Sequence, residues 1–173
     1  MRICFKNSEN VANGAFCIDA TAGRGRDTLF LSKLVGESGK VLAFDIQKDA
    51  IESTGALLDQ ENVKNATLIL DSHSNMDQYA KKESVDAIMF NFGWLPGGSH
   101  KIFTPPETSI PAIEAGLRLL KPGGIMSLCI YYGGESGYGV LKIQVAERTE
   151  QPSRRAEIES DEFFARRRAL LPR

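Results

Sequence analysis

Ala15-Phe16-Cys17-Ile18-Asp19-Ala20-Thr21-Ala22-Gly23-Arg24-Gly25-Arg26-Asp27-Thr28 is the segment from which the fold of this 173-residue chain can be inferred. Its apolar run ends in Asp19, a loop spaced by Gly23 and Gly25 follows, and an amphipathic run begins at Leu29. This order predicts a strand, a tight turn and a helix, with which α/β proteins form a crevice at the carboxyl end of a strand. The two glycines have no Cβ, so the backbone can turn sharply there and approach a ligand closely.

The same alternation of apolar runs and amphipathic segments continues to residue 131. Strands are expected at 15–20, 41–44, 67–70, 85–90 and 125–131, and helices from Asp27 to Val35 and over 48–60, 74–81 and 107–120. Lys121-Pro122-Gly123-Gly124 is expected to terminate the last helix. Nearly continuous apolar strands that alternate with helices predict an α/β fold, a Rossmann-like, doubly wound and mostly parallel sheet with helices on both faces.

Composition excludes several classes of protein. The chain has 42% hydrophobic residues and a net charge of −1, which argues against a protein that coats nucleic acid but leaves room for a local basic surface. Neither a signal peptide nor an apolar run of the roughly 20 residues that cross a bilayer is visible, so we expect a cytoplasmic protein without a membrane partner. The three cysteines are far apart, which favours reduced thiols over disulfides or a metal site, with Cys17 and Cys129 as small core residues.

The last 33 residues differ in composition from the rest. We expect one domain over 1–140, followed by a charged, arginine-rich tail over 141–173 that is not a separate domain. No convincing strand follows 140–145. The tail suits either a solvated or disordered end or a basic arm for RNA phosphate, although interleaved acids dilute its positive charge.

Polar residues stand at the carboxyl ends of four predicted strands: Asp19, Asp45, Asp71 and Asn91. Strand ends in a parallel sheet converge on one crevice. A nicotinamide cofactor would require a third glycine where Thr28 stands, so S-adenosyl-L-methionine, which has no phosphate, fits better. Asp45 would accept the ribose hydroxyls, and Asp71 with Ser72 and His73 would border the adenine. Another nucleotide remains an alternative, as does a role for His73 as a satisfied polar loop residue.

Asn91-Phe92-Gly93-Trp94 is the predicted reaction-side motif. Methyl transfer to nitrogen needs a neutral lone pair aimed at the donor methyl; Asn91 would orient the amine, and the Trp94 ring would support the substrate and the cationic donor. Phe92 and Trp94 could instead only cover the sheet edge. His100, in the Gly/Pro-rich segment 92–106, could take the amine's proton or be merely an exposed loop residue.

Several motifs together resemble the bacterial family named putative rRNA methylases. They are Asp19-Ala-Thr-Ala-Gly-Arg-Gly-Arg-Asp-Thr-Leu-Phe-Leu, Phe44-Asp-Ile-Gln, Asp71-Ser-His, Asn91-Phe-Gly-Trp-Leu-Pro-Gly-Gly, Pro106-Glu-Thr and Ile130-Tyr-Tyr-Gly-Gly. The resemblance spans roughly 11–138. It implies a class I methyltransferase that uses S-adenosyl-L-methionine to methylate the 5-aminomethyl group of the wobble (2-thio)uridine in the anticodon region of tRNA.

The resemblance also implies a set of cofactor-binding residues: Gly23, Gly25, Asp27, Thr28, Asp45, Gln47, Asp71, Ser72 and His73. The family's further helix and strands are not recognisable after Tyr138, so we expect the C-terminal strands to be missing or altered. Other hypotheses are a methyltransferase acting on a small amine or on rRNA, and an inactive cofactor-binding domain whose exposed sheet edge pairs in a homodimer.

Overall fold

The computed structural model describes residues 11–92, 106–130 and 163–166. Its elements are β1 (Phe16–Asp19), α2 (Arg26–Val35), β2 (Lys40–Asp45), α3 (Lys48–Gln60), β3 (Ala66–Leu70), the 3₁₀ helix η1 (His73–Gln78), β4 (Val85–Phe92), α4 (Pro106–Leu119), β5 (Leu120–Ile130) and β6 (Phe163–Arg166). The predicted alternation of strands and helices is confirmed over the first five strands.

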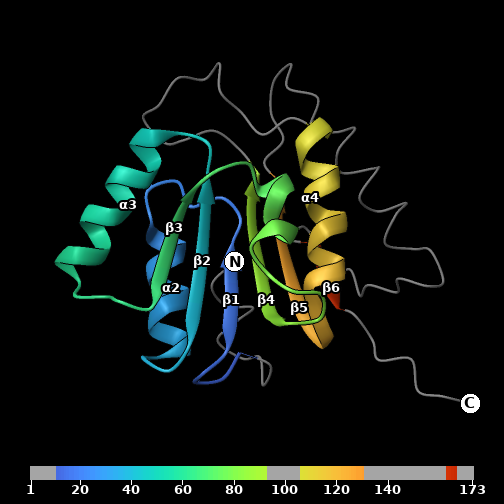
Figure 1. Cartoon of the computed structure of the whole chain (residues 1–173), viewed down its shortest axis with the longest axis horizontal. Coiled ribbons are helices and arrows are strands. Elements are labelled where there is room, and N and C mark those ends of the chain that lie inside the picture. Colours follow the sequence, from blue (N-terminus) through green and yellow to red (C-terminus); the bar gives the residue numbers. More distant parts are fainter. Residues whose placement is uncertain (1–10, 93–105, 131–162, 167–173) are drawn as a thin grey trace, which may run out of the picture.

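These strands form one sheet in the order β3-β2-β1-β4-β5-β6 (Figure 1). The first five are parallel. The chain winds outward from β1 through β2 to β3 and then returns to place β4 on the other side of β1, so the strand order reverses between β1 and β4. Ligands of open α/β sheets bind outside the carboxyl ends of the strands at such a switch point.

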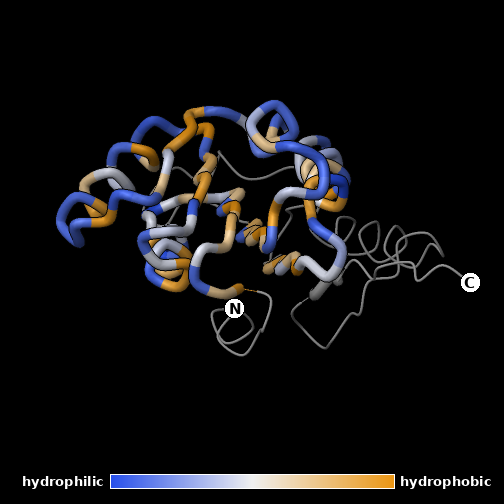
Figure 2. The backbone as a smooth tube through the Cα atoms, turned by 60° about the horizontal axis from the view of Figure 1, so that its bottom comes forward, coloured by the Kyte–Doolittle hydropathy of each residue, from blue (hydrophilic) through white to orange (hydrophobic). Residues whose placement is uncertain are grey.

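Two apolar clusters hold helices on opposite faces of the sheet. Alternate side chains of a strand point to opposite faces, so Ile18 and Ile88 join a cluster with Ile113 of α4 and Met76 of η1. Cys17 and its neighbours on the other face pack with Leu31 and Val35 of α2. Figure 2 shows hydrophobic stretches along the central strands, whereas α3, on the outside, alternates hydrophilic and hydrophobic positions. The predicted doubly wound fold with helices on both faces is therefore confirmed.

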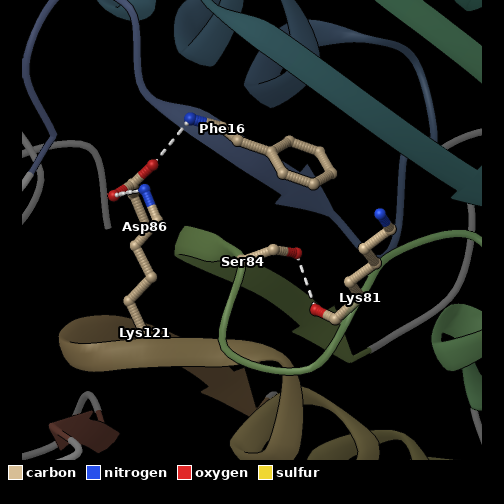
Figure 3. Close-up of polar contacts among 5 residues, drawn as sticks. All are labelled: Phe16, Lys81, Ser84, Asp86 and Lys121. Carbon is tan, nitrogen blue, oxygen red and sulfur yellow. Dashed lines mark hydrogen bonds and ion pairs between the residues drawn. The ribbon is translucent and has the colours of Figure 1, made fainter.

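Asp86 bridges three strands through hydrogen bonds of its carboxylate (Figure 3). It lies at the amino-terminal edge of the sheet, opposite the predicted site. Its Oδ2 accepts a hydrogen bond from the Phe16 backbone N–H at 2.8 Å, and its Oδ1 accepts one from Lys121 Nζ at 2.7 Å. The carboxylate thus connects the start of β1 to β4 and β5.

Four details differ from the sequence-based expectations. The short helix expected near 74–81 is the 3₁₀ helix η1, which starts earlier, at His73, ends at Gln78 and is capped by the Ser72 hydroxyl. Strand β4 extends through Asn91 and Phe92, because β5 continues beside it to the pair Phe92–Ile130. Lys121–Gly124 does end α4 but lies within β5, where a shift in register between Val85 and Ala87 accommodates it.

The fourth difference is in the predicted tail. The expectation that no strand follows 140–145 is wrong, since β6 pairs antiparallel with β5, with Ile125 opposite Arg166 and Leu128 opposite Phe163. Strand β6 is only four residues long and is far in sequence from its partner, so no local pattern announced it. The proposed boundary at residue 140 lies outside the described residues.

Candidate functional site

The carboxyl edge of the sheet brings the predicted polar residues together. Strands β1 and β2 end at Asp19 and Asp45, Asp71 follows β3, and Asn91 is the second-last residue of β4. These four strands are neighbours in the order β3-β2-β1-β4. The four side chains therefore line one edge, on both sides of the switch point.

The loop after β1 turns through two glycines in left-handed conformations, Gly23 at φ 54° and Gly25 at φ 78°. The loop is fixed to β2 and α3: the Gly23 N–H donates to Asp45 Oδ2 at 3.0 Å, and the Gly23 carbonyl accepts from Thr54 Oγ1 at 3.2 Å. The Gly25 backbone lies so close to α3 that a Cβ there would stand 2.9 Å from Thr54 Cγ2. The turn thus requires glycine for both conformation and space.

Gly25→Ala is expected to lower the free energy of unfolding by at least about 2 kcal/mol, because left-handed backbone strain adds to the overlap with Thr54. Gly55→Ala is the matched control. Gly55 lies inside α3, and its added Cβ would meet Leu68 Cδ1 at an ordinary 3.5 Å, so this variant should gain about 0.5–1 kcal/mol. Urea denaturation of both variants checks the pair; equal effects would contradict this description of the loop.

Asp45 connects the glycine loop to the start of α3. Besides its bond to Gly23, its Oδ1 accepts the Gln47 N–H at 2.9 Å, and Gln47 is the residue that precedes the first turn of α3. Each carboxylate oxygen can accept two hydrogen bonds. Asp45 is half-buried, so both oxygens retain capacity for a ligand hydroxyl.

Asp19 is almost completely buried, at 1% exposure. Burial is the main cause that raises the pKa of its carboxyl to about 7; the nearby carboxylates of Asp27 and Asp45 raise it further, against the hydrogen bond from Thr28. Thr28 Oγ1 donates to Asp19 Oδ2 at 2.7 Å and is itself fully buried. Thr28 therefore lies behind Asp19, and its influence on a ligand would pass through this carboxyl.

Asp71 is held by three donors. Its Oδ1 accepts from the Ser72 N–H and from Asn75 Nδ2, and its Oδ2 accepts from the Tyr79 hydroxyl at 2.8 Å. The hydrogen bonds from Asn75, Tyr79 and Ser72 lower the pKa of this carboxyl. Oδ1 has used both of its acceptor positions, so only Oδ2 retains one.

His73 is buried beneath this edge, at 9% exposure. Its Nδ1 lies 3.2 Å from the Ala20 carbonyl, and the Phe90 and Phe92 rings meet it edge-on. Burial lowers the pKa of His73 to about 4, so the ring is neutral at pH 7. Because a carbonyl only accepts, Nδ1 holds the hydrogen, and Nε2 is an acceptor that has no partner among the described residues.

Asn91 is fixed at both its backbone and its side chain. Its N–H donates to Thr21 Oγ1 at 2.7 Å, and its Nδ2 donates to Asp27 Oδ2 at 2.6 Å. The remaining side-chain atom, Oδ1, is buried and has no hydrogen-bond partner within the described ranges. The β4 exit is thus connected to the glycine loop and to α2, and it offers one unused acceptor.

Two residues of this edge were not predicted from the sequence. Ile46, directly after Asp45, is 58% exposed, and an apolar side chain that is left in solvent beside these carboxylates is available to a flat ring. Thr21 supports Asn91, and its own N–H donates to Asp19 Oδ1 at 3.1 Å. Ile46 could have been predicted, because it is an apolar residue between the polar residues Asp45 and Gln47 that follow the predicted strand. Nothing in the sequence pattern identified Thr21.

Some predicted features lie outside the described residues, namely Trp94, His100 and most of the tail. Within the described ranges, no three His, Cys, Asp or Glu side chains are grouped so that they could hold a metal ion. No helix in the described part of the chain is both long and apolar enough to cross a membrane. A cavity of about 430 Å³ lies at the amino-terminal edge beside Asp86 and Lys121, and none of the predicted site residues lines it.

Comparison with known proteins gives a consistent set of relatives. Residues 41–155 match the family model described as Putative rRNA methylase. A chloroplastic tRNA (mnm(5)s(2)U34)-methyltransferase of Arabidopsis thaliana is 42% identical over 146 residues, which are 77% of this chain and 52% of that protein. The chain therefore spans about half the length of this relative.

Two solved structures share both fold and sequence. A putative rRNA-methylase from Clostridium thermocellum is 39% identical with a TM-score of 0.80, and the match covers 90% of each chain. A putative methyltransferase from Streptococcus mutans, solved in complex with SAH, is 33% identical with a TM-score of 0.75, over 90% of this chain and 89% of that one.

Proposed function

This chain belongs to the family of putative rRNA methylases, and we propose on that basis that it is an S-adenosyl-L-methionine-dependent N-methyltransferase acting on the 5-aminomethyl group of the wobble uridine in tRNA. The name of the Arabidopsis relative supports this substrate, and the SAH complex of the Streptococcus protein supports the cofactor. The observation that carries the reaction class in this chain is the buried Oδ1 of Asn91 at the switch point, which has no hydrogen-bond partner among the residues that the structure describes.

The carboxyl edge fits the cofactor. Asp45 retains acceptor capacity for the ribose hydroxyls, Asp71 Oδ2 retains one position for the adenine amine, and the exposed Ile46 would pack on the adenine ring. The backbone at Gly23, Gly25 and Gln47 would approach the cofactor closely, and Ser72 and His73 would border its adenine. When bound, S-adenosyl-L-methionine supplies a sulfonium methyl that a nucleophile can accept.

Asn91 suits an amine acceptor. Because Nδ2 donates one of its hydrogens to Asp27, the amide nitrogen is turned toward that carboxylate, and Oδ1 on the other branch would accept an N–H from the substrate. A substrate amine that donates an N–H to Oδ1 keeps its lone pair free to attack the methyl group. A substrate carboxylate could not bind in this way, because it has no hydrogen to donate. The site therefore favours a neutral nitrogen that has at least one hydrogen.

The rest of the proposed machinery follows Phe92. Trp94 would support the uridine ring and His100 would take the proton that the amine loses; both residues lie outside the described ranges. An rRNA or a small amine as acceptor, and an inactive domain that binds the cofactor only, are the competing outcomes of the test.

The test measures transfer of labelled methyl from S-adenosyl-L-methionine by the purified full chain. The acceptor is tRNA whose wobble uridine has an unmethylated aminomethyl group, and the matched control is the same tRNA fully methylated. We expect label in the first and none in the second. Label in rRNA or in small primary amines, but not in this tRNA, would contradict the substrate, and cofactor binding without any transfer would contradict the activity.

A further inference from the structure

We propose that Asp27 is the positioning residue that sets which way the Asn91 amide faces, rather than a direct ligand of the cofactor. This inference rests on the proposed function, in which Asn91 Oδ1 holds the acceptor amine. The two residues are 64 positions apart in sequence and come from α2 and β4, on either side of the switch point.

The carboxylate determines the orientation of the amide by chemistry alone. An ionised carboxylate only accepts hydrogen bonds, so the amide atom 2.6 Å from Asp27 Oδ2 must be the nitrogen. The amide oxygen is then the atom on the other branch, and this is the buried Oδ1 that lacks a partner within the described ranges. Turning the amide over would set two acceptors against each other.

The backbone of Asn91 is fixed independently by Thr21, through the 2.7 Å bond from the Asn91 N–H. The Asn91 Cα is therefore held by β4 and the glycine loop, and the Asp27 contact leaves one orientation for the side chain. A buried acceptor without a partner is destabilising, and a substrate N–H would remove that cost on binding. Asp27 thus holds Asn91 Oδ1 in an orientation in which this oxygen accepts no hydrogen bond from the described residues and can accept one from the substrate.

This assignment separates two roles that the sequence could not distinguish. If Asp27 binds the cofactor directly, its removal weakens cofactor affinity. If it orients Asn91, its removal lowers kcat toward the amine while cofactor affinity stays nearly constant, because the carboxylate acts through another side chain.

Asp27→Asn is the first variant, since an amide at position 27 can pair with Asn91 in either orientation. We expect kcat for methyl transfer to fall about 10- to 100-fold, as for other small misplacements of a reacting group. The dissociation constant of SAH, measured by calorimetry, should stay within about 3-fold, well under 1 kcal/mol. Asp49→Asn is the matched control: Asp49 is also an acid in the first turn of its helix, exposed at the start of α3, and its loss should change neither quantity.

The exchanged pair is the decisive variant. Asn91→Asp alone places two carboxylates against each other and should be worse than Asp27→Asn alone. The double variant D27N/N91D restores one donor facing one carboxylate and leaves a free carboxylate oxygen toward the amine. We expect it to recover at least about 10-fold over Asn91→Asp.

A readout without substrate keeps this test separate from the proposed function. The side-chain NH₂ signals of Asn91 in a ¹⁵N spectrum, assigned by their loss in Asn91→Asp, should shift in Asp27→Asn and stay in place in Asp49→Asn. If the wild type transfers no methyl to tRNA but these signals behave as stated, the proposed function fails and the positioning role stands. Unshifted signals, a fall in SAH affinity as large as the fall in kcat, or a double variant no better than Asn91→Asp would each overturn it.

Discussion

Asp45→Ala is expected to abolish methyl transfer and to weaken SAH binding by at least about 100-fold. The carboxylate makes two backbone hydrogen bonds, to Gly23 and Gln47, in addition to those it would offer the ribose. Hydrogen bonds to a charged group contribute about 1.5–3 kcal/mol each, so the loss of two ribose contacts alone accounts for a 100-fold change. Calorimetric titration with SAH and a single-turnover assay measure both effects.

Loss of Asp45 also removes the acceptor that ties the glycine loop to β2, so the variant needs a control for stability. Asp49→Ala removes a carboxylate four residues along the chain, in the first turn of α3, and should keep affinity within about 3-fold. Urea midpoints show whether the Asp45 variant is folded at the assay temperature. An Asp45→Ala protein that is folded and binds SAH as tightly as the wild type would contradict the proposed cofactor site.

Asp19→Asn is expected to stabilise the unliganded protein at pH 8 but not at pH 4. Burial raises the pKa of this carboxyl from 3.8 to about 7, so the folded state binds a proton that the unfolded state has released over that interval. Stability contributed by the neutral acid is fully present below pH 4 and is lost as the pH rises through 7. Above pH 7 the wild type holds a buried charge, at a cost on the order of a few kcal/mol.

An amide at position 19 keeps both local contacts, because it can accept from the Thr21 N–H and donate to Thr28 Oγ1. The difference in free energy of unfolding between Asp19→Asn and the wild type should therefore grow in favour of the variant between pH 4 and pH 8. Urea denaturation at the two pH values measures it. If the difference in free energy of unfolding were the same at pH 4 and at pH 8, Asp19 would not titrate between these pH values.

The strand ends explain why so much of this edge was predictable. A buried parallel strand is recognisable in the sequence as an apolar run that ends in a polar residue. Asp19, Asp45, Asp71 and Asn91 each stand at such an end, and the carboxyl ends of neighbouring parallel strands lie at one edge of the sheet, so their proximity could be predicted. Thr28 stands where a nicotinamide site would have a third glycine, and its fully buried side chain donates to Asp19.

The contacts that were not predictable join elements far apart in sequence. Nothing near Asp27 reveals that its partner is Asn91, and the hydroxyl of Thr21 supports β4 only because strands β1 and β4 are neighbours. Strand β6 was missed for the same reason, since four residues gain strand structure only from the β5 edge beside them. Sequence pattern thus predicts which polar residues stand at strand ends, while tertiary contacts decide how each side chain is held.

We propose methyl transfer, at the carboxyl edge of this sheet, to the aminomethyl nitrogen of the wobble uridine. Its most direct test is mass analysis of nucleosides from tRNA incubated with the purified chain and S-adenosyl-L-methionine. We predict one new methyl on the aminomethyl nitrogen of that uridine, present with the wild type and absent with Asp45→Ala. A methyl at any other nucleoside or atom, or an unchanged tRNA treated with protein that binds SAH, would contradict it.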